Sequence, residues 1–402
     1  MHKRGCKFRE MVSIYRLLLI STAFIASAVV ATAQNVGRQP LKMVETDSVV
    51  LYDFFWCDAQ RWAYSTLTED ARSWPWQREN LTDKALSRRV AEWERSLLDM
   101  RLEGSLCDSV RKVDEVLPML RETVELGWQT REARFFDVAE RMMTNVLMEF
   151  SKFYPLWNMK HDVLARVMGS VGSVAYATCG HDIYVNMLMR SNVHVSNGDV
   201  DFCMQIFNSA PWYNDTSIRI TKDMNPVEAV ADTVLSPYHR LIVREESGAD
   251  SLDLSFHIRI PSWTDGKDML PTCKAQCKRQ PVIIMVNGNL FTPEMENGYA
   301  VISGRWAVGD LITIKVPTPI LRVFDSRQPG MVALQRGPIV YSFDNLYKGM
   351  VFDSKSTVSH YFDNKLNAIV LKGKVENSYG RLDNAYVPAF IPGSNKIFEK
   401  VK

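Results

Sequence analysis

Leu252–Ile260, which reads LDLSFHIRI, alternates apolar and polar residues along its whole length. Successive side chains of a strand point to opposite sheet faces, so this stretch predicts a strand with one buried face. Val282–Val286, Tyr299–Ile302 and Leu311–Val316 continue the pattern, and Asn287-Gly288 marks a tight turn. Short strands at such spacing are typical of a β-sandwich.

Composition places the chain among ordinary globular proteins. It has 402 residues, a formal net charge of +2 and 46% hydrophobic residues. That length predicts two or three domains, each with its own core. The sequence contains no dense Lys/Arg block with interleaved aromatic residues, so nucleic acid is not an expected partner.

The first 33 residues resemble an export signal. A basic lead precedes the apolar run Leu17–Val30, and Ala31-Thr32-Ala33 offers small residues at the cleavage positions. We predict a signal peptide over residues 1–33, a mature chain beginning at Gln34, and a periplasmic or extracellular location. The apolar run is shorter than the roughly 20 residues of a membrane span, so no span is expected after cleavage.

Six cysteines remain in the mature chain, which is too few for a disulfide scaffold of this length. Cys273 and Cys277 lie in a polar insertion between predicted strands. A zinc half-site there would need a second Cys or His pair nearby, and the sequence has none. A local disulfide or two thiols is therefore the favoured interpretation.

Residues 34–178 are predicted to be helical, because apolar residues recur there at three- and four-residue steps. In the helix predicted from Ala133, the charged residues are assigned to the solvent-facing side; they are Glu132, Arg134, Asp137, Glu140 and Arg141. A further helix is predicted over 163–177, where Gly169 and Gly172 would let a neighbouring element come close. Residues 179–320 are predicted as a β-sandwich and 321–402 as a smaller C-terminal β region.

Several motifs together resemble one family. In chain order they are Phe136–Arg141, Ala165–Val167, Tyr176–Thr178, Asp182–Asn186, Arg259–Trp263, Val286–Gly288, Asn297–Tyr299, Arg305-Trp306 with Gly309-Asp310, and Arg336–Tyr341. This ordered set, over roughly residues 130 to 345, resembles the bacterial β-L-arabinofuranosidases of glycoside hydrolase family 127. The resemblance implies a catalytic (α/α) barrel followed by β-sandwiches, and an action on terminal L-arabinofuranose of plant glycans.

The resemblance also implies a cysteine thiolate nucleophile, held with other cysteines and a glutamate around zinc. The family's adjacent cysteine pair corresponds here to Met159 and Lys160, and no cysteine occurs between Cys107 and Cys179. A thioether is a weak ligand and an ammonium repels a metal ion. We therefore predict that nucleophile and zinc are lost, so no metal, no cofactor and no known catalytic residue is assigned. Cys107 with Glu103 is either a remnant of the ligand set or a buried structural cysteine.

Length leads to the same expectation. A barrel of about twelve helices, with about 12 residues per helix and about 5 per loop, needs on the order of 200 residues. Residues 34–178 offer fewer. We predict a shortened barrel remnant, whose bared apolar surface would favour a partner or a homo-oligomer. The predicted fold class is thus α+β, with a truncated barrel-like helical part before the sandwiches.

The sequence also offers residues for other chemistries. Acids for a two-carboxylate glycosidase exist, but their spacing places most of them on solvated helix faces; they are Glu92, Glu94, Glu103, Asp114, Glu115, Glu122 and Glu125. Tryptophans are dense early in the mature chain and are assigned to the core rather than to sugar stacking; they are Trp56, Trp62, Trp74, Trp76 and Trp93. Trp212, Trp263 and Trp306 are assigned to the sandwich core, and His257 to packing within its strand.

Three hypotheses follow. The first is a secreted, non-catalytic or carbohydrate-binding homologue of the arabinofuranosidases, with a plant-type glycan as its partner. The alternative is an active glycosidase that releases L-arabinofuranose with replacement acids. The third is a gene fragment without a function of its own.

Overall fold

The structure is a computed structural model. It describes residues 41–45, 48–51, 56–66, 81–99, 113–147, 161–189, 191–196, 201–208, 216–221, 251–266, 273–278, 280–307, 310–327, 329–343, 351–366, 368–377, 380–389 and 399–400. Within these ranges no helix has the length and apolarity needed to cross a membrane.

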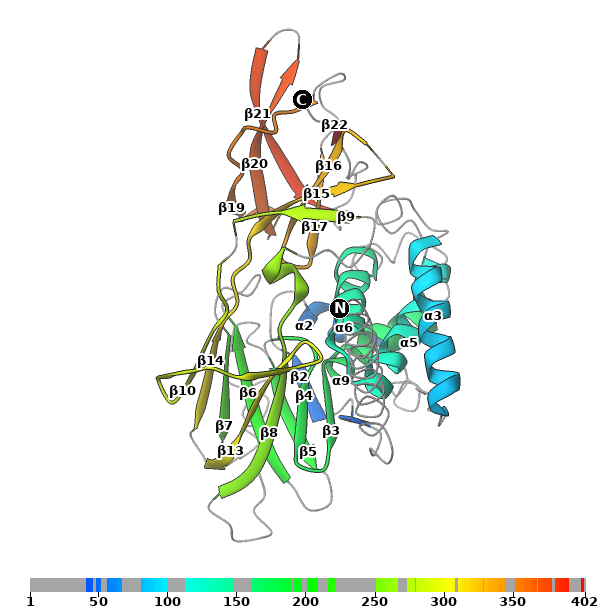
Figure 1. Cartoon of the computed structure of the whole chain (residues 1–402), viewed down its shortest axis with the longest axis vertical. Helices are drawn as coiled ribbons and strands as arrows, with labels where there is room; N and C mark the ends of the chain where they lie inside the picture. The colour runs from blue at the N-terminus through cyan, green and yellow to red at the C-terminus, as the bar shows by residue number, and fades with distance from the viewer. Residues whose placement is uncertain are drawn as a thin grey trace, which may run out of the picture.

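Helices lie together on one side of the sheets (Figure 1). They are α2 (Trp56–Thr66), α3 (Asp83–Asp99), α5 (Val113–Thr130), α6 (Ala133–Met142), the π-helical turn η3 (Met143–Leu147), α8 (His161–Gly169) and α9 (Val171–Ala175). Their apolar sides form the core predicted from the periodicity: Trp93, Val124 and Phe135 are buried, and the rings of Trp93 and Phe135 lie 4.7 Å apart. Trp56 is buried as well and Trp62 is partly buried against the core, so the core assignment is confirmed for Trp56 and Trp93, whereas Trp74 and Trp76 lie outside the described residues.

The first sheet has the strand order β1-β3-β4-β8-β13-β12. Its strands are β1 (Lys42–Met43), β3 (Tyr176–Cys179), β4 (Asp182–Val185), β8 (Ser251–Arg259), β13 (Tyr299–Ala307) and β12 (Glu294–Glu296). β4 runs parallel to β8, and β8 runs antiparallel to β13 over nine residue pairs. The alternation read from residues 252–260 is confirmed for the core face, where Leu254, Phe256 and Ile258 are buried. The expectation of a single buried face is wrong at the end of the strand, because His257 and Arg259 are buried on the opposite face.

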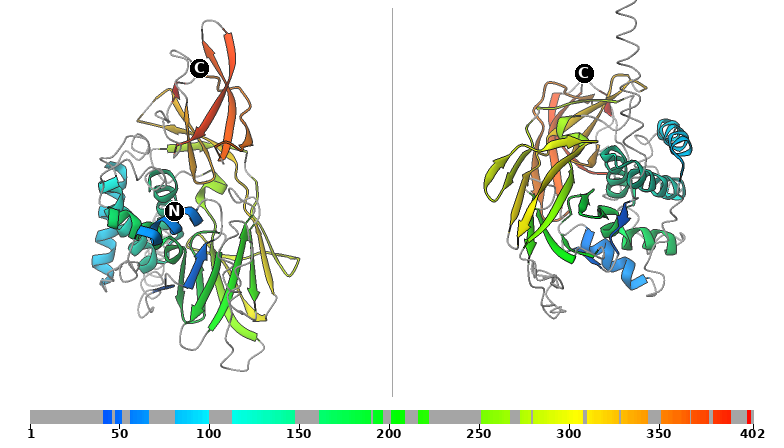
Figure 2. Two further views of the ribbon diagram at one scale, coloured as in Figure 1. Left: turned by 180° about the vertical axis from the view of Figure 1, so that it is seen from behind. Right: turned by 60° about the horizontal axis from the view of Figure 1, so that its bottom comes forward.

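The second sheet has the order β11-β10-β14-β7-β6-β5-β2 and packs against that apolar face (Figure 2). Its strands are β11 (Asn289–Phe291), β10 (Ile283–Val286), β14 (Leu311–Lys315), β7 (Thr216–Thr221), β6 (Asp201–Asn208), β5 (Ser191–Ser196) and β2 (Val49–Leu51). Ile312 and Ile314 of β14 share the core with Phe256, whose ring meets that of Trp306 edge-on at 5.2 Å. The core positions predicted for Trp263 and Trp306 are confirmed.

A third sheet lies at the C-terminal end of the molecule (Figure 1), with the order β18-β20-β21-β17-β16-β15-β9. The strands are β18 (Val351–Phe352), β20 (Ala368–Asn377), β21 (Gly380–Pro388), β17 (Ile339–Phe343), β16 (Met331–Arg336), β15 (Ile320–Asp325) and β9 (Cys273–Gln276), with β19 (Ser359–Asp363) beside β20 and β22 (Glu399–Lys400) beside β16. Phe343, Phe352 and Tyr386 fill its core with edge-on ring contacts.

The structure corrects two local expectations. The predicted polar insertion around Cys273 contains strand β9, whose exposed Lys274 and Gln276 suit an edge strand that borders solvent. The helix predicted over 163–177 breaks after Gly169 and gives way at Tyr176 to strand β3, because β3 pairs with both β1 and β4.

Residues 34–178 are also not wholly helical. β1 extends the first sheet and β2 the second, so this early segment contributes strands to both layers of the sandwich. Gln60 of α2 holds β2, because its amide accepts from Leu51 N and donates to Val49 O, each at 3.3 Å. Gly172 permits the close approach that was predicted: a Cβ placed there would lie 2.7 Å from Val49 Cγ1. The α+β class is confirmed, whereas the barrel form of the helical part stays a prediction.

Candidate functional site

The positions that the resemblance links to catalysis lie outside the described residues. Glu103, Cys107, Met159 and Lys160 belong to segments 100–112 and 148–160, so the loss of the nucleophile stays a prediction. In the part of the chain that the structure describes, no three His, Cys, Asp or Glu side chains are grouped so that they could hold a metal ion. A zinc site of the family type would have to draw on other segments.

Of the acids considered as replacements, the structure describes the side chains of four, which belong to α3 and α5: Glu92, Glu94, Glu122 and Glu125. Glu92 and Glu94 are about half exposed, and Glu94 accepts a hydrogen bond from Arg134 at 2.6 Å. Glu125 is largely buried, but Arg121 contacts it at 3.1 Å. Glu122 pairs with Arg89 at 3.5 Å, and the side chains of Asp114 and Glu115 are not described. Most described acids are thus engaged by arginines, as expected of solvated helix faces.

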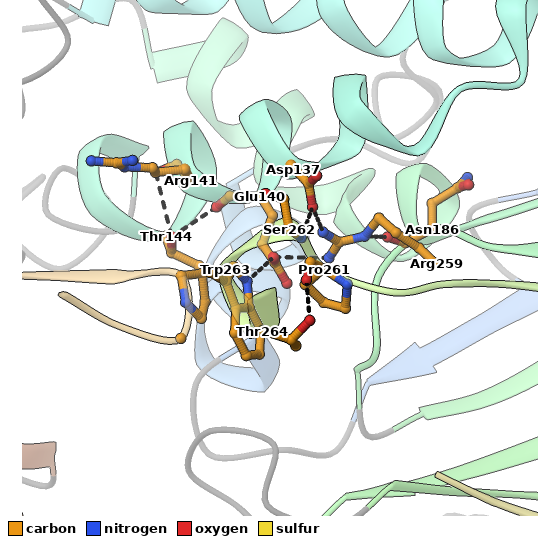
Figure 3. Close-up of polar contacts among 12 residues, drawn as sticks. Asp137, Glu140, Arg141, Thr144, Asn186, Arg259, Pro261, Ser262, Trp263 and Thr264 are labelled. Atoms are coloured by element: carbon orange, nitrogen blue, oxygen red, sulfur yellow. Dashed lines mark hydrogen bonds and ion pairs between the residues drawn. The ribbon is translucent and has the colours of Figure 1, made fainter. Parts of the chain in front are cut away.

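The strongest polar cluster is instead buried where α6 meets the sandwich (Figure 3). Asp137 and Glu140 stand three positions apart on α6, which places both on the same side of the helix. Arg259, the last residue of β8, reaches both: its Nη1 lies 2.5 Å from Asp137 Oδ1 and its Nη2 lies 2.8 Å from Glu140 Oε2. One guanidinium therefore binds two carboxylates.

Local sequence explains why Arg259 arrives there. Alternation along β8 places His257 and Arg259 on the face opposite the apolar core, toward the helices. Pro261 then ends the strand, because its ring leaves no N–H for pairing, and the chain turns into the 3₁₀ helix η5 (Ser262–Asp265). Two groups of this turn donate hydrogen bonds to the cluster. Ser262 N donates to Asp137 Oδ1 at 3.2 Å, and Trp263 Nε1 donates to Glu140 Oε2 at 3.4 Å.

Asn186 connects the cluster to strand β4 and to helix α9. Its main-chain oxygen accepts from Arg259 Nε, and its side-chain Oδ1 accepts from the Tyr299 hydroxyl at 2.8 Å. Its Nδ2 donates to Val174 O at 3.4 Å. All four residues are buried, so their polar groups satisfy one another away from water.

Two further contacts attach the helical part to the sheets. Asn145 of η3 donates to Pro338 O and accepts from Val340 N, both at 2.9 Å, which ties it to the turn between β16 and β17 of the third sheet. At the start of α6, Ala133 N donates to Asn297 O at 2.9 Å. Gly298 has φ +87°, and a Cβ there would lie 2.7 Å from Ala133 Cβ, so this turn needs glycine.

The charges of the cluster do not balance. Burial raises the pKa of Asp137 and of Glu140, while Arg259 acts to lower both. Burial also acts to lower the pKa of Arg259, but Glu140 and Asp137 raise it above its ordinary value. Two acids thus share a single cation in a place from which water is excluded.

This geometry makes the cluster a junction rather than a catalytic centre. The side chains of Arg259 and Glu140 are 1% and 2% exposed, so a sugar has no access to them. What the arrangement does is fix the helical part on the sandwich through charge-assisted hydrogen bonds. We call Asp137, Glu140, Asn186, Arg259 and Trp263 the helix–sandwich junction.

The junction corrects the sequence analysis. Asp137, Glu140 and Arg141 were predicted on the solvent-facing side of their helix, but Glu140 and Arg141 are buried and Asp137 is largely so. A signal was present: a lone arginine between apolar residues and a proline, in a strand that was otherwise read correctly, needs an acid partner. The partner lies 122 residues away, and no local pattern identifies it.

A second polar group lies beside the junction on the same sheet face. The rings of Tyr184 and His257 stack with centroids 4.3 Å apart, and His257 Nε2 lies 3.4 Å from Asp182 Oδ1. Arg131, with φ +57°, places its guanidinium 5.8 Å from the centre of the Tyr184 ring and donates to Cys179 Sγ at 3.3 Å. His257 is buried, which confirms packing as its role.

Helices seated on a sandwich through a buried junction define a multidomain α+β scaffold. Residues 182–318 match the sequence profile described as "Beta-L-arabinofuranosidase, GH127 middle domain". Among solved structures, a GH127 β-arabinofuranosidase is 16% identical with a TM-score of 0.57, and the match covers 70% of this chain and 48% of that one. The chain is therefore a GH127-like protein in its middle domain and its fold.

Two other solved structures agree. A GH127 β-L-arabinofuranosidase from Geobacillus stearothermophilus T6 is 15% identical with a TM-score of 0.54, over 71% of this chain and 49% of that one. A glycoside hydrolase is 13% identical with a TM-score of 0.53, over 71% and 52%. The chain spans about half the length of these structures. No curated protein sequence matches it.

Proposed function

We propose that the chain is a secreted relative of the β-L-arabinofuranosidases that binds a plant-type glycan without cleaving it. The observation that carries the proposal is the contrast between two parts of the molecule. The helix–sandwich junction is complete in every contact described above, whereas the sequence has Met159 and Lys160 where the family has its cysteine pair. A chain that keeps the scaffold but not the nucleophile suits binding better than hydrolysis.

Physical chemistry supports the loss of activity. The family-type reaction needs a thiolate, and a thiol becomes one near neutral pH when a metal ion or a cation lowers its pKa. The sequence offers no cysteine from 108 to 178 to be activated in this way. The described acids of α3 and α5 that could replace it are mostly engaged by arginines, which favours binding over the alternative mechanism.

The decisive experiment measures sugar release and sugar binding on the same sample. The mature chain from Gln34 is incubated with arabinose-rich plant glycans and simple L-arabinofuranosides, with and without zinc, beside the Geobacillus enzyme as an active control. We expect no released L-arabinose but retarded migration in gels that contain the glycan. Release of L-arabinose would overturn the proposal and direct attention to Glu125; neither release nor retardation would favour a fragment without function.

A further inference from the structure

The helix–sandwich junction contains two acids and one base, and nothing in the proposed function explains the extra acid. If both carboxyls are ionised, Arg259 cancels one of the two negative charges and the other stays buried. An uncompensated buried charge is costly, and two carboxylates that share a site favour a state in which one of them is protonated. One bound proton would make the junction neutral.

No other described cation takes the place of that proton. Arg141 follows Glu140 on α6, but its guanidinium points away from both acids (Figure 3). From β13 the junction meets Tyr299, from β4 the main-chain oxygen of Asn186, and from η5 the indole of Trp263 and the amide of Ser262. Apart from Arg259 these groups are neutral donors or acceptors.

The contacts also leave room for a proton. Arg259 and Ser262 N donate to Asp137 Oδ1, and the Ser262 side chain also bonds Asp137, whereas Arg259 and Trp263 Nε1 meet Glu140 at its Oε2. A proton on the other carboxyl oxygen of Glu140 would break none of these hydrogen bonds. We infer that the junction is a proton-dependent latch. Asp137 and Glu140 hold one proton between them when the helical part is docked on the sandwich, and release of this proton to solvent weakens the docking.

The direction of the pH dependence follows from the raised pKa values of the two acids. Burial raises them above the ordinary 3.8 of Asp137 and 4.5 of Glu140, so the docked state binds a proton that the undocked state has lost. The contribution to docking is fully present below the ordinary values. It is lost as the pH rises through the raised ones, and over this interval one proton changes the docking equilibrium about tenfold per pH unit.

Hydrogen exchange of the mature chain from pH 5 to 8 tests the latch. The peptide that contains Ser262 reports on the junction, because this amide donates to Asp137; the β20–β21 hairpin is a distant reference. After correction for the intrinsic exchange rate, we expect protection of the Ser262 peptide to fall by up to tenfold per pH unit while the reference stays constant. A constant protection at Ser262 would overturn the latch without any variant.

Variants separate the latch from a general effect of pH. Asp137→Asn and Glu140→Gln each remove one ionisable acid and keep its shape, so each should abolish the pH dependence at Ser262. Glu92→Gln on the exposed face of α3 is the matched control and should retain it. A pH dependence that persists in both junction variants would show that the proton binds elsewhere and would refute the assignment.

Discussion

Removing the single cation of the junction should separate the helical part from the sandwich. In Arg259→Leu the side chain keeps much of its apolar stem but loses its hydrogen bonds to Asp137, Glu140 and Asn186. Asp137 keeps Ser262 as a donor, through its main-chain N at 3.2 Å and through its side chain, and Glu140 keeps the more distant Trp263 Nε1 at 3.4 Å. Even with one proton shared between the two acids, a buried negative charge would then have no counter-charge.

The magnitude follows from those losses. Two charge-assisted hydrogen bonds contribute about 1.5–3 kcal/mol each, and breaking a buried ion pair by removing one partner costs about 3–5 kcal/mol. We expect the variant to lose about 3–5 kcal/mol of unfolding free energy at pH 7.5. The loss should be smaller at pH 5, because protonation of the abandoned acids relieves part of the cost.

Urea unfolding, followed by far-ultraviolet circular dichroism and by tryptophan fluorescence, measures this loss. The helical signal should disappear at lower urea than in the wild type, because the helices no longer have their strongest attachment. Arg305→Leu is the control: Arg305 is exposed and bonds Ser251, so its loss should stay within about 0.5 kcal/mol. If Arg259→Leu is no more harmful than Arg305→Leu at pH 7.5, the junction does not hold these parts together.

Two further substitutions test neighbouring contacts by thermal unfolding. Asn145→Ala leaves the buried groups at the β16–β17 turn without their partner and should cost about 1–3 kcal/mol, whereas Asn289→Ala on exposed β11 should leave the midpoint unchanged. Gly172→Ala should cost about 1–3 kcal/mol by overpacking against Val49. The double variant with Val49→Ala should lose less than the sum of the two single variants; a loss equal to that sum would show that this contact is not the cause.

Local patterns correctly predicted those features that depend only on the side chains of a single segment. The alternation of Leu252–Ile260 gave the correct buried face, because period-two side chains leave no ambiguity once one face is apolar. Trp56, Trp93, Trp263 and Trp306 were correctly predicted in the core, because large aromatic side chains are more often buried than exposed. These conclusions needed only the side chains of each segment itself.

The predictions that were wrong concern residues whose place is decided by contacts with residues far away in the sequence. Asp137 and Glu140 were assigned to solvent because charged side chains are rarely buried unless paired, and the pairing depends on where β8 ends. Tyr176 was read as helical because it continues an apolar run, whereas pairing of β3 with β1 and β4 makes it a strand. The catalytic positions around residues 100–112 and 148–160 lie outside the described residues and stay predictions.

Strand β9 affects how the chain can be divided. It lies between β8 and β10 in the sequence, yet it pairs with β15 in the third sheet. Likewise, β1 and β2 precede the helices but pair with strands that follow them. A cut near residue 179 would therefore separate β2 from its partner β5, and a cut near residue 320 would separate β9 from its partner β15. The parts of this protein are distinct in space but interleaved along the chain, and a shortened gene would lose more than the piece it omits.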